Sequence, residues 1–357
     1  MAGSALVNAL GAVPLGSGSA ALQQLSGQPY ADFATVNMRA SQLFMNAVGR
    51  QAALDRGTGF GAGQSVALGA PGLDGQSRLT GWVSGIGTKG GVDGNANASD
   101  LSYSLGGTAF GINYRIDPSY QIGIAGGYTG GSQSVDGFRG DSSAKALSLA
   151  VHGSFAHGPV YVDALMGYAH ASNELQRIMT VPGIAGTAKG DTDANQFLGQ
   201  IETGYRFAFD GSAHASITPF GRLQVVNVRQ EAFTETGSSA FNLAVNGQTT
   251  TSVRTILGAD FATRFELGAG MPLDLSLRLG WVHEFGATDR PLTAAFAAAS
   301  WAPFTVYGAP EQRDGALIGL AAELKILANA ALFASYDAEL GSGSDTHQLQ
   351  GGIRFTW

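Results

Sequence analysis

The sequence predicts an all-β fold: a closed, antiparallel transmembrane barrel of twelve strands that follows one long α-helix. Three observations carry this prediction. From residue 78 onward, apolar and polar side chains alternate with a period of two. Most of the alternating segments run about ten residues or more, the length that a tilted strand needs to cross a membrane. Only 13% of the 357 residues are charged, well below the roughly 25% of a typical soluble domain.

The rest of the composition excludes several classes of protein. The chain has no Cys, which excludes a disulfide scaffold and a thiolate metal site. Its formal net charge of −7 argues against a nucleic-acid partner, because nucleic-acid binders present a basic surface. The longest uncharged stretches, 1–31 and 291–310, are interrupted by Gly and Pro, so neither is a continuous apolar helix of about 20 residues. The low charge therefore favours strands that face lipid.

Residues 1–28 are small, polar and rich in Gly, with a short helix expected at Ser19–Leu25. They lack the basic segment that precedes the apolar core of a secretory signal. We expect them to be the end of a preceding segment of a longer precursor, with Met1 added. The alternative is a signal with an unusual start.

The strongest helix signal covers residues 29–56. Pro29 suits the first helical turn, and Gly57 suits a stop. Such a helix is roughly 40 Å long, enough to cross a bilayer. It is too polar to touch lipid, because one arc of it consists of Arg39, Gln42, Asn46 and Arg50. A Gly-rich linker at 57–77 then leads to the barrel, which we expect to occupy 78–357.

The alternation is clearest at 273–281, where Leu or Trp fills every odd position and Asp, Ser, Arg or Gly every even one. Short connections alternate with long ones near 91–102, 175–191, 232–249 and 287–313, which is typical of an outer-membrane barrel. A soluble β-sandwich is the alternative, but its strands run only about 5–6 residues. The twelve predicted strands are 78–90, 103–116, 120–132, 143–155, 160–174, 192–209, 216–231, 250–265, 273–286, 314–326, 331–340 and 346–357.

Three motifs that suggest ligand chemistry fail on their context. The stretch 191–202 approaches the spacing of a calcium loop, but Gln196 stands where that loop needs Gly. Residues 85–90 match GxGxxG but do not open a helix. The six His residues show no ligand spacing. We therefore predict no catalytic residue, no metal site and no cofactor.

Several segments occur in a distinctive order. The helix entry reads ALQQLSGQPYADFATV, and the first two strands contain GWVSGIG and GGTAFGINYRID. They are followed by ITPFGRLQVVNVRQEAFTETG, FNLAVNGQTTTSVRTILGADF and the closing ASYDAELGSGSDTHQLQGGIRFTW. In this order, from about Ala20 to Trp357, the chain resembles the C-terminal translocator domain of type Va autotransporters of Gram-negative bacteria.

The resemblance implies that the helix runs through the lumen of the barrel. It implies a bacterial outer-membrane protein that supports secretion of an N-terminal passenger and whose pore the helix then occludes. The implied partners are outer-membrane lipid, the chain's own passenger and the barrel assembly machinery, and we expect a monomer. The alternative function is a general outer-membrane channel or structural barrel. A porin, however, begins with its first strand and has about 16–18 strands.

A polar helix in a lumen needs polar walls, because buried polar groups must be satisfied. We expect the helix arc to contact inward side chains of the barrel. The candidates are Glu202, Arg206, Arg222, Arg254, Asp260 and Arg278, with Gln224, Arg264, Glu323, Asp337, Glu339 and Arg354 as further inward residues. In this family the last strand is the signal for barrel assembly, so the resemblance assigns this role to Ile353, Phe355 and Trp357.

Some autotransporters cut their own chain inside the barrel at paired asparagines. Here Asn37 and Asn46 are isolated, so the resemblance does not carry this activity over and we expect no enzyme. The apolar segment 291–310 has two open placements. It either folds over the barrel mouth or touches the lipid interface through Trp301 and Phe304.

Overall fold

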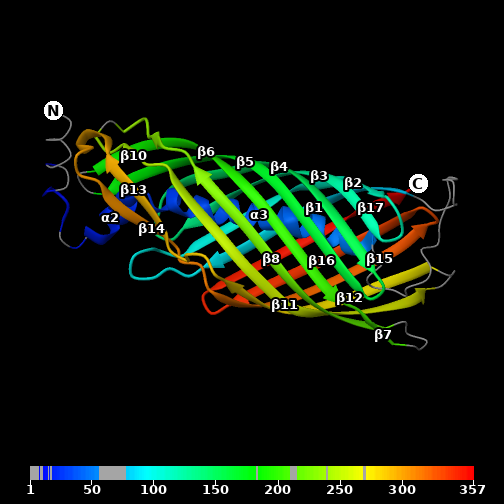
Figure 1. Cartoon of the computed structure of the whole chain (residues 1–357). Coiled ribbons are helices and arrows are strands. Elements are labelled where there is room, and N and C mark those ends of the chain that lie inside the picture. The colour runs from blue at the N-terminus through cyan, green and yellow to red at the C-terminus, as the bar shows by residue number, and fades with distance from the viewer. Residues whose placement is uncertain are drawn as a thin grey trace.

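Twelve antiparallel strands close into a barrel around a central helix in the computed structural model (Figure 1). This arrangement confirms the fold class predicted from the sequence. The structure describes residue 8, residues 11–14, residue 16 and residues 18–55, 78–181, 184–209, 215–238, 240–267 and 271–357.

The barrel wall is one continuous ring of hydrogen-bonded neighbours. β1 and β17 pair from Thr80↔Thr356 to Val92↔Ser344, and this pairing joins the first strand to the last. The two-residue β7 (Phe207–Ala208) continues β6 and pairs with β8. The wall strands are β1 (Leu79–Val92), β2 (Leu101–Arg115), β3 (Tyr120–Val135), β4 (Gly140–His157), β5 (Val160–Val181), β6 (Ile184–Tyr205), β8 (Ser216–Gln230), β11 (Gln248–Leu267), β12 (Met271–Glu284), β15 (Asp314–Leu327), β16 (Ala330–Gly341) and β17 (Ser344–Thr356).

The alternation in the sequence sorts side chains between the two faces of the wall. On β12, Leu275, Leu279 and Trp281 point outward and are 36–49% exposed, whereas Asp274 and Arg278 point inward and are 6% exposed. Successive side chains of a strand point to opposite faces. The outer face is therefore apolar and the lumen polar, the inverse of a soluble β-barrel.

Two consecutive helices precede the barrel. α2 (Gly18–Ser26) lies at one end of the barrel, and α3 (Gln28–Asp55) runs inside it (Figure 1). Gly27 joins them with a φ of 74°, a left-handed conformation that favours glycine. Every residue of α3 from Gln28 to Met45 is buried. Among the described residues, no helix is both long and apolar enough to span a bilayer.

A second, four-stranded sheet covers the end of the barrel that carries the long loops (Figure 1). We call this sheet the cap and this end the loop end; the opposite end is the turn end. The cap segment between β13 and β14 contains a short 3-10 helix, η3 (Ala297–Ala299). The cap strands are β9 (Phe233–Thr234), β10 (Leu243–Val245), β13 (Arg290–Phe296) and β14 (Phe304–Gly308).

The cap resolves the placement of the apolar segment 291–310. Leu292 and Ala309 are buried in one cluster with Tyr30 and Phe33 of α3. Apolar side chains of this segment thus cover the helix at the barrel mouth, while Trp301 is 85% exposed.

The largest difference from the expected strands lies at 175–191. Instead of a loop, β5 and β6 remain paired as far as Val181↔Ile184. Within this stretch Gly190 serves close packing, because a Cβ there would meet Tyr30 and Phe233. The expected last helical residue, Arg56, and the linker 57–77 lie outside the described residues.

Candidate functional site

The two sides of α3 meet the barrel in different ways. One side packs closely against the wall from β1 to β8. There the ring of Phe44 lies over Gly127, where a Cβ would come within 2.7 Å of it. Ser41 donates to the side-chain oxygen of Gln196 at 2.5 Å. This side holds the helix through close packing of apolar and small polar side chains.

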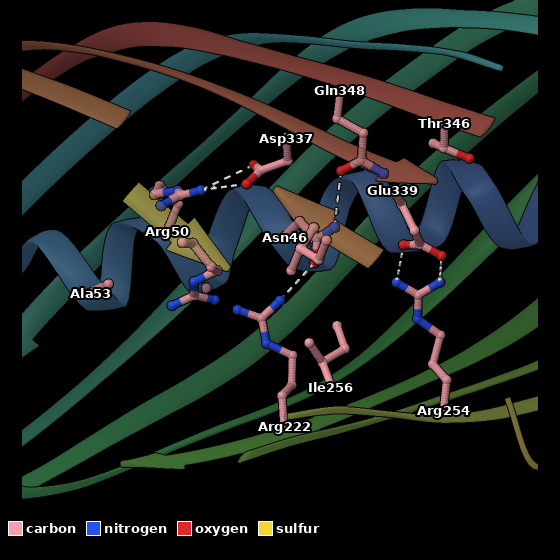
Figure 2. A pocket seen from close by; sticks show the side chains of 13 residues that line it. Asn46, Arg50, Ala53, Arg222, Arg254, Ile256, Asp337, Glu339, Thr346 and Gln348 are labelled. Atoms are coloured by element: carbon pink, nitrogen blue, oxygen red, sulfur yellow. Dashed lines mark hydrogen bonds and ion pairs between the residues drawn. The ribbon is translucent and has the colours of Figure 1, made fainter. Parts of the chain in front are cut away.

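The other side of α3 reaches the wall through long polar side chains. Arg50 donates to both carboxylate oxygens of Asp337, at 2.9 and 3.0 Å. Asn46 donates to Gln348 at 2.9 Å and accepts from Arg222 at 3.1 Å. Figure 2 shows these side chains converging from the helix and from strands on the facing wall. A polar cavity remains between them, lined by residues of α3, β8, β11, β12, β15, β16 and β17.

A third contact on this side lies nearer the loop end. Arg39, 4% exposed, donates to Glu311 at 2.5 Å and lies 3.6 Å from Glu339. Arg39 also donates to Gln42 at 3.1 Å. Each buried guanidinium of the helix thus has a carboxylate partner on the barrel, as a buried charge requires.

The wall itself carries a connected network of charges. Arg222 and Arg278 both contact Glu202, at 2.6 and 3.2 Å, and Arg278 also holds Asp260 at 2.6 Å. Arg254 donates to both oxygens of Glu339, at 3.0 and 2.8 Å. Positive and negative side chains alternate in this network. The attraction between opposite charges offsets part of the free-energy cost of burying each of them.

At the turn end, the last helical residue is held by the barrel. Asp55 accepts from Arg354 at 2.7 Å, from Gln121 at 2.7 Å and from Asn113. Arg354 in turn donates to Glu323 at 2.5 Å. Sequence reasoning missed Asp55. The available signal was the opposite charge of two residues, an inward Arg354 on the last strand and a carboxylate at the end of the helix.

At the loop end, the helix start contacts the cap and the loops. The hydroxyl of Tyr30 donates to Glu235 at 2.8 Å, and Glu235 pairs with Arg177 at 2.5 Å. Gln28 donates to the carbonyl of Ser99 at 2.9 Å. None of these residues was a candidate, because no pattern in the sequence indicates that two distant loops meet over the helix.

The expected helix residues and wall residues fall into two groups. Arg39, Asn46 and Arg50 reach the wall directly, whereas Gln42 contacts Arg39. Among the six wall candidates expected to contact the helix, Arg222 does so, through Asn46. Four others, Glu202, Arg254, Asp260 and Arg278, have wall partners, and Arg206 lies at the turn end, where its amide donates to Pro159.

The last strand lies against the first along its whole length. The backbone of Trp357 exchanges hydrogen bonds with Leu79 at 3.1 and 3.0 Å. The ring of Trp357 lies over Gly81, where a Cβ would come within 2.8 Å of it. Phe355 and Trp357 are 41% and 47% exposed on the outer face, and Ile353 is partly exposed. Within the described part of the chain, no group of three or more His, Asp or Glu side chains could hold a metal ion.

A closed barrel with an apolar outer face, whose polar lumen is filled by the chain's own helix, defines a translocator-type barrel of the outer membrane. The family model described as Autotransporter beta-domain matches residues 81–337. The chain therefore belongs to the autotransporter β-domain family. It is an outer-membrane translocator domain, and its loop end faces the cell exterior, since outer-membrane barrels carry long loops outside and short turns inside.

Known relatives agree with this assignment. The chain is 26% identical over 343 residues, or 94% of its length, to an extracellular serine protease of Serratia marcescens. It is 24% identical over 260 residues, 72% of its length, to the esterase EstA of Pseudomonas aeruginosa. The matched regions are only 30% and 38% of those proteins' own lengths.

Solved translocator structures share the fold. The translocator domain of the autotransporter NalP from Neisseria meningitidis superposes with a TM-score of 0.65 at 16% identity, covering 91% of this chain and 98% of NalP's. The β-domain of the Bordetella autotransporter BrkA gives 0.59 at 16% identity, covering 78% and 100%.

Asp32 is a buried carboxylate at the level of the cap, outside the membrane-spanning part of the barrel. It is 0% exposed, accepts from the amide of Ala309 at 2.7 Å and from Gln28 at 3.2 Å. Burial raises the pKa of Asp32 from 3.8 to about 7, and Glu311 also raises it, against the lowering effect of these hydrogen bonds and of Arg290. Asp32 therefore holds its proton more tightly when the helix is seated.

This shift makes the seated helix sensitive to pH. Below pH ~4 Asp32 is protonated whether seated or released. As the pH rises towards about 7, only the released carboxyl loses its proton, so the seated state loses stability on the order of 4 kcal/mol. We expect a rise from pH 4 to pH 7 to lower the thermal unfolding midpoint of the unmodified chain relative to that of Asp32→Asn.

The control is Asp345→Asn, which changes a half-exposed carboxylate on β17. Circular dichroism melts of the three proteins across this pH range make the comparison, and the difference between variants cancels other titrating groups. Identical pH dependence of the unmodified chain and Asp32→Asn would contradict the assignment.

Proposed function

We propose that this barrel supports export of an N-terminal passenger across the outer membrane and that α3 afterwards occludes the lumen. The observation that carries the proposal is the fixing of α3 at both ends and at its centre. Tyr30 is held at the loop end, Asn46 and Arg50 at the centre, and Asp55 at the turn end. A helix held along its whole length stays in place once it has arrived.

The same polar wall suits both passage of the unfolded passenger and later binding of α3. A polar lumen with charges of both signs hydrates an unfolded chain in transit, since it offers donors and acceptors along the whole path. When α3 arrives, Asp337 and Gln348 exchange water for Arg50 and Asn46. On this side of the helix the exchanged groups are charged or polar, whereas on the other side apolar residues such as Leu43 and Phe44 pack against the wall.

We also propose that the barrel does not cut its own chain at Asn46. Asn46 is held by Gln348, Arg222 and Gln224, which leaves its amide committed to structural contacts rather than to attack on the chain. Intact mass spectrometry of the refolded chain tests this point, since self-cleavage would give two fragments. We further propose that the domain acts as a monomer, because closure of the barrel leaves no strand edge for a second copy.

We expect removal of residues 1–57 to raise single-channel conductance in planar bilayers several-fold, because the deletion takes α3 out of the lumen. A deletion of residues 1–17 is the matched control, since it retains α2 and α3, and it should conduct like the full chain. Equal and large conductance for all three would mean an open channel, and the alternative of a general outer-membrane channel would replace the translocator mechanism.

The last strand supplies the proposed signal for the barrel assembly machinery. The outward residues Ile353 and Phe355 lie at the end of β17, which pairs with β1, and Trp357 follows directly. We expect Trp357→Ala to slow assembly in cells, measured as the heat-modifiable folded fraction in outer membranes after a pulse of synthesis. Thr356→Ala, one residue earlier, should assemble normally. Equal assembly of both variants would refute the signal.

A further inference from the structure

The segment Gln24–Asp32 contacts four separate parts of the loop end. It touches the loop between β1 and β2, the extension of β5, the loop that carries β9, and the residue that follows β14. We propose that these elements form a binding site for Gln24–Asp32 and that this site sets the register at which the exported chain stops. The inference rests on the proposed translocator function.

A fully buried ion pair lies at the centre of this site. Arg177 and Glu235 are both 0% exposed at their side chains and lie 2.5 Å apart. The exported segment completes the hydrogen bonds of both. Arg177 donates to the carbonyl of Gln24 at 3.0 Å, and Glu235 accepts from the hydroxyl of Tyr30 at 2.8 Å.

Because the segment completes these hydrogen bonds, the stability of the closed cap depends on the segment being in place. A buried charged network is favourable when every member is satisfied and costly when one partner is absent. With another part of the chain in the mouth, Glu235 lacks the Tyr30 hydroxyl, and Arg177 must use the backbone carbonyl of a different residue. The closed cap is therefore most stable when Gln24–Asp32 occupies it.

Packing limits the site to one register. Gly27 has a φ of 74°, and a Cβ there would come within 2.7 Å of a methyl group of Leu243. A shift of the chain by one residue would place Ser26 or Gln28 at a φ of 74°, which residues with a Cβ rarely adopt, and the added side chain would also crowd Leu243. The side chain of Tyr30 also depends on a glycine, because a Cβ on Gly190 would collide with its ring and hydroxyl.

Backbone contacts tighten the same register. Gln28 both donates to the Ser99 carbonyl and accepts from the Ser99 amide, each at 2.9 Å. Gln133 donates to the carbonyl of Pro29 at 2.6 Å. Deeper in the lumen, Arg39 and Arg50 hold the helix through long side chains, which adapt to small displacements. Phe44 and Asp55 also fix the helix inside the barrel, and the mouth adds the sequence-specific contacts of Gln28 and Tyr30 that select where the chain stops.

Cysteine labelling of the refolded 357-residue chain tests the proposal, because the chain has no Cys of its own. Val36→Cys reports on the mouth, where Val36 is 0% exposed, and Ala52→Cys reports on the turn end, where Ala52 is 4% exposed. The two positions are roughly 24 Å apart along the helix. Each reporter is reacted with a charged methanethiosulfonate reagent, and the labelling rate is measured.

We expect Glu235→Gln to speed labelling at both reporters about tenfold, the effect of one lost charge-assisted contact. Tyr30→Phe removes one hydroxyl and should give a smaller increase at both. Glu231→Gln is the matched control, since it makes the same change at an exposed position of the same loop, and it should leave both rates unchanged. Heat-modifiable gel mobility confirms that each variant has folded.

Two results would overturn the register site. One is a labelling rate in Glu235→Gln that equals the rate in the control Glu231→Gln at both cysteine reporters. The other is faster labelling at Val36→Cys alone, which would mean that the cap loosens without movement of the helix. The proposal that α3 occludes the pore is tested separately, and unchanged conductance after deletion of residues 1–57 would contradict it.

Discussion

A lumen that is polar and too wide for its own wall side chains is the constraint on which the rest of the structure depends. Barrels of about eight strands fill their interior with wall side chains, whereas twelve strands leave room for a helix. That helix must itself be polar, because the walls present Arg222, Arg278 and Glu202. The arc of Arg39, Asn46 and Arg50 follows from this requirement, as does the burial of nearly every residue of α3.

The helix is held unequally around its circumference and along its length. Phe44 and Ser41 fit one wall closely, while Arg39 and Arg50 bridge a polar cavity to the other. Close packing gives a defined seat, and long charged side chains give attraction with tolerance for displacement. This combination of close packing on one side and long charged side chains on the other suits a segment that moves through the lumen and is then held there.

Much of the fold could be predicted from the sequence because period-two alternation reports directly on two solvents, lipid outside and water inside. The same rule placed Glu202, Arg222 and Arg278 in the lumen. It could not foresee the cap, whose strands β9, β10 and β14 are too short to show a period. Nor could it foresee Tyr30, Glu235 and Asp55, since their roles depend on which loops meet over the helix ends. Gly190 was read as a loop residue although it serves packing under Tyr30.

The most direct test of a seated lumenal helix is a crosslink in native outer membranes. The amide of Asn46 donates to Gln348 at 2.9 Å inside the barrel, whereas the next residue, Leu349, is 63% exposed on the outside. With Asn46→Cys combined with Gln348→Cys, a short bifunctional thiol reagent should join the two peptides, as read by mass spectrometry. With Asn46→Cys and Leu349→Cys it should not. No crosslink in the first pair, or equal crosslinking in both, would contradict a helix held in the lumen.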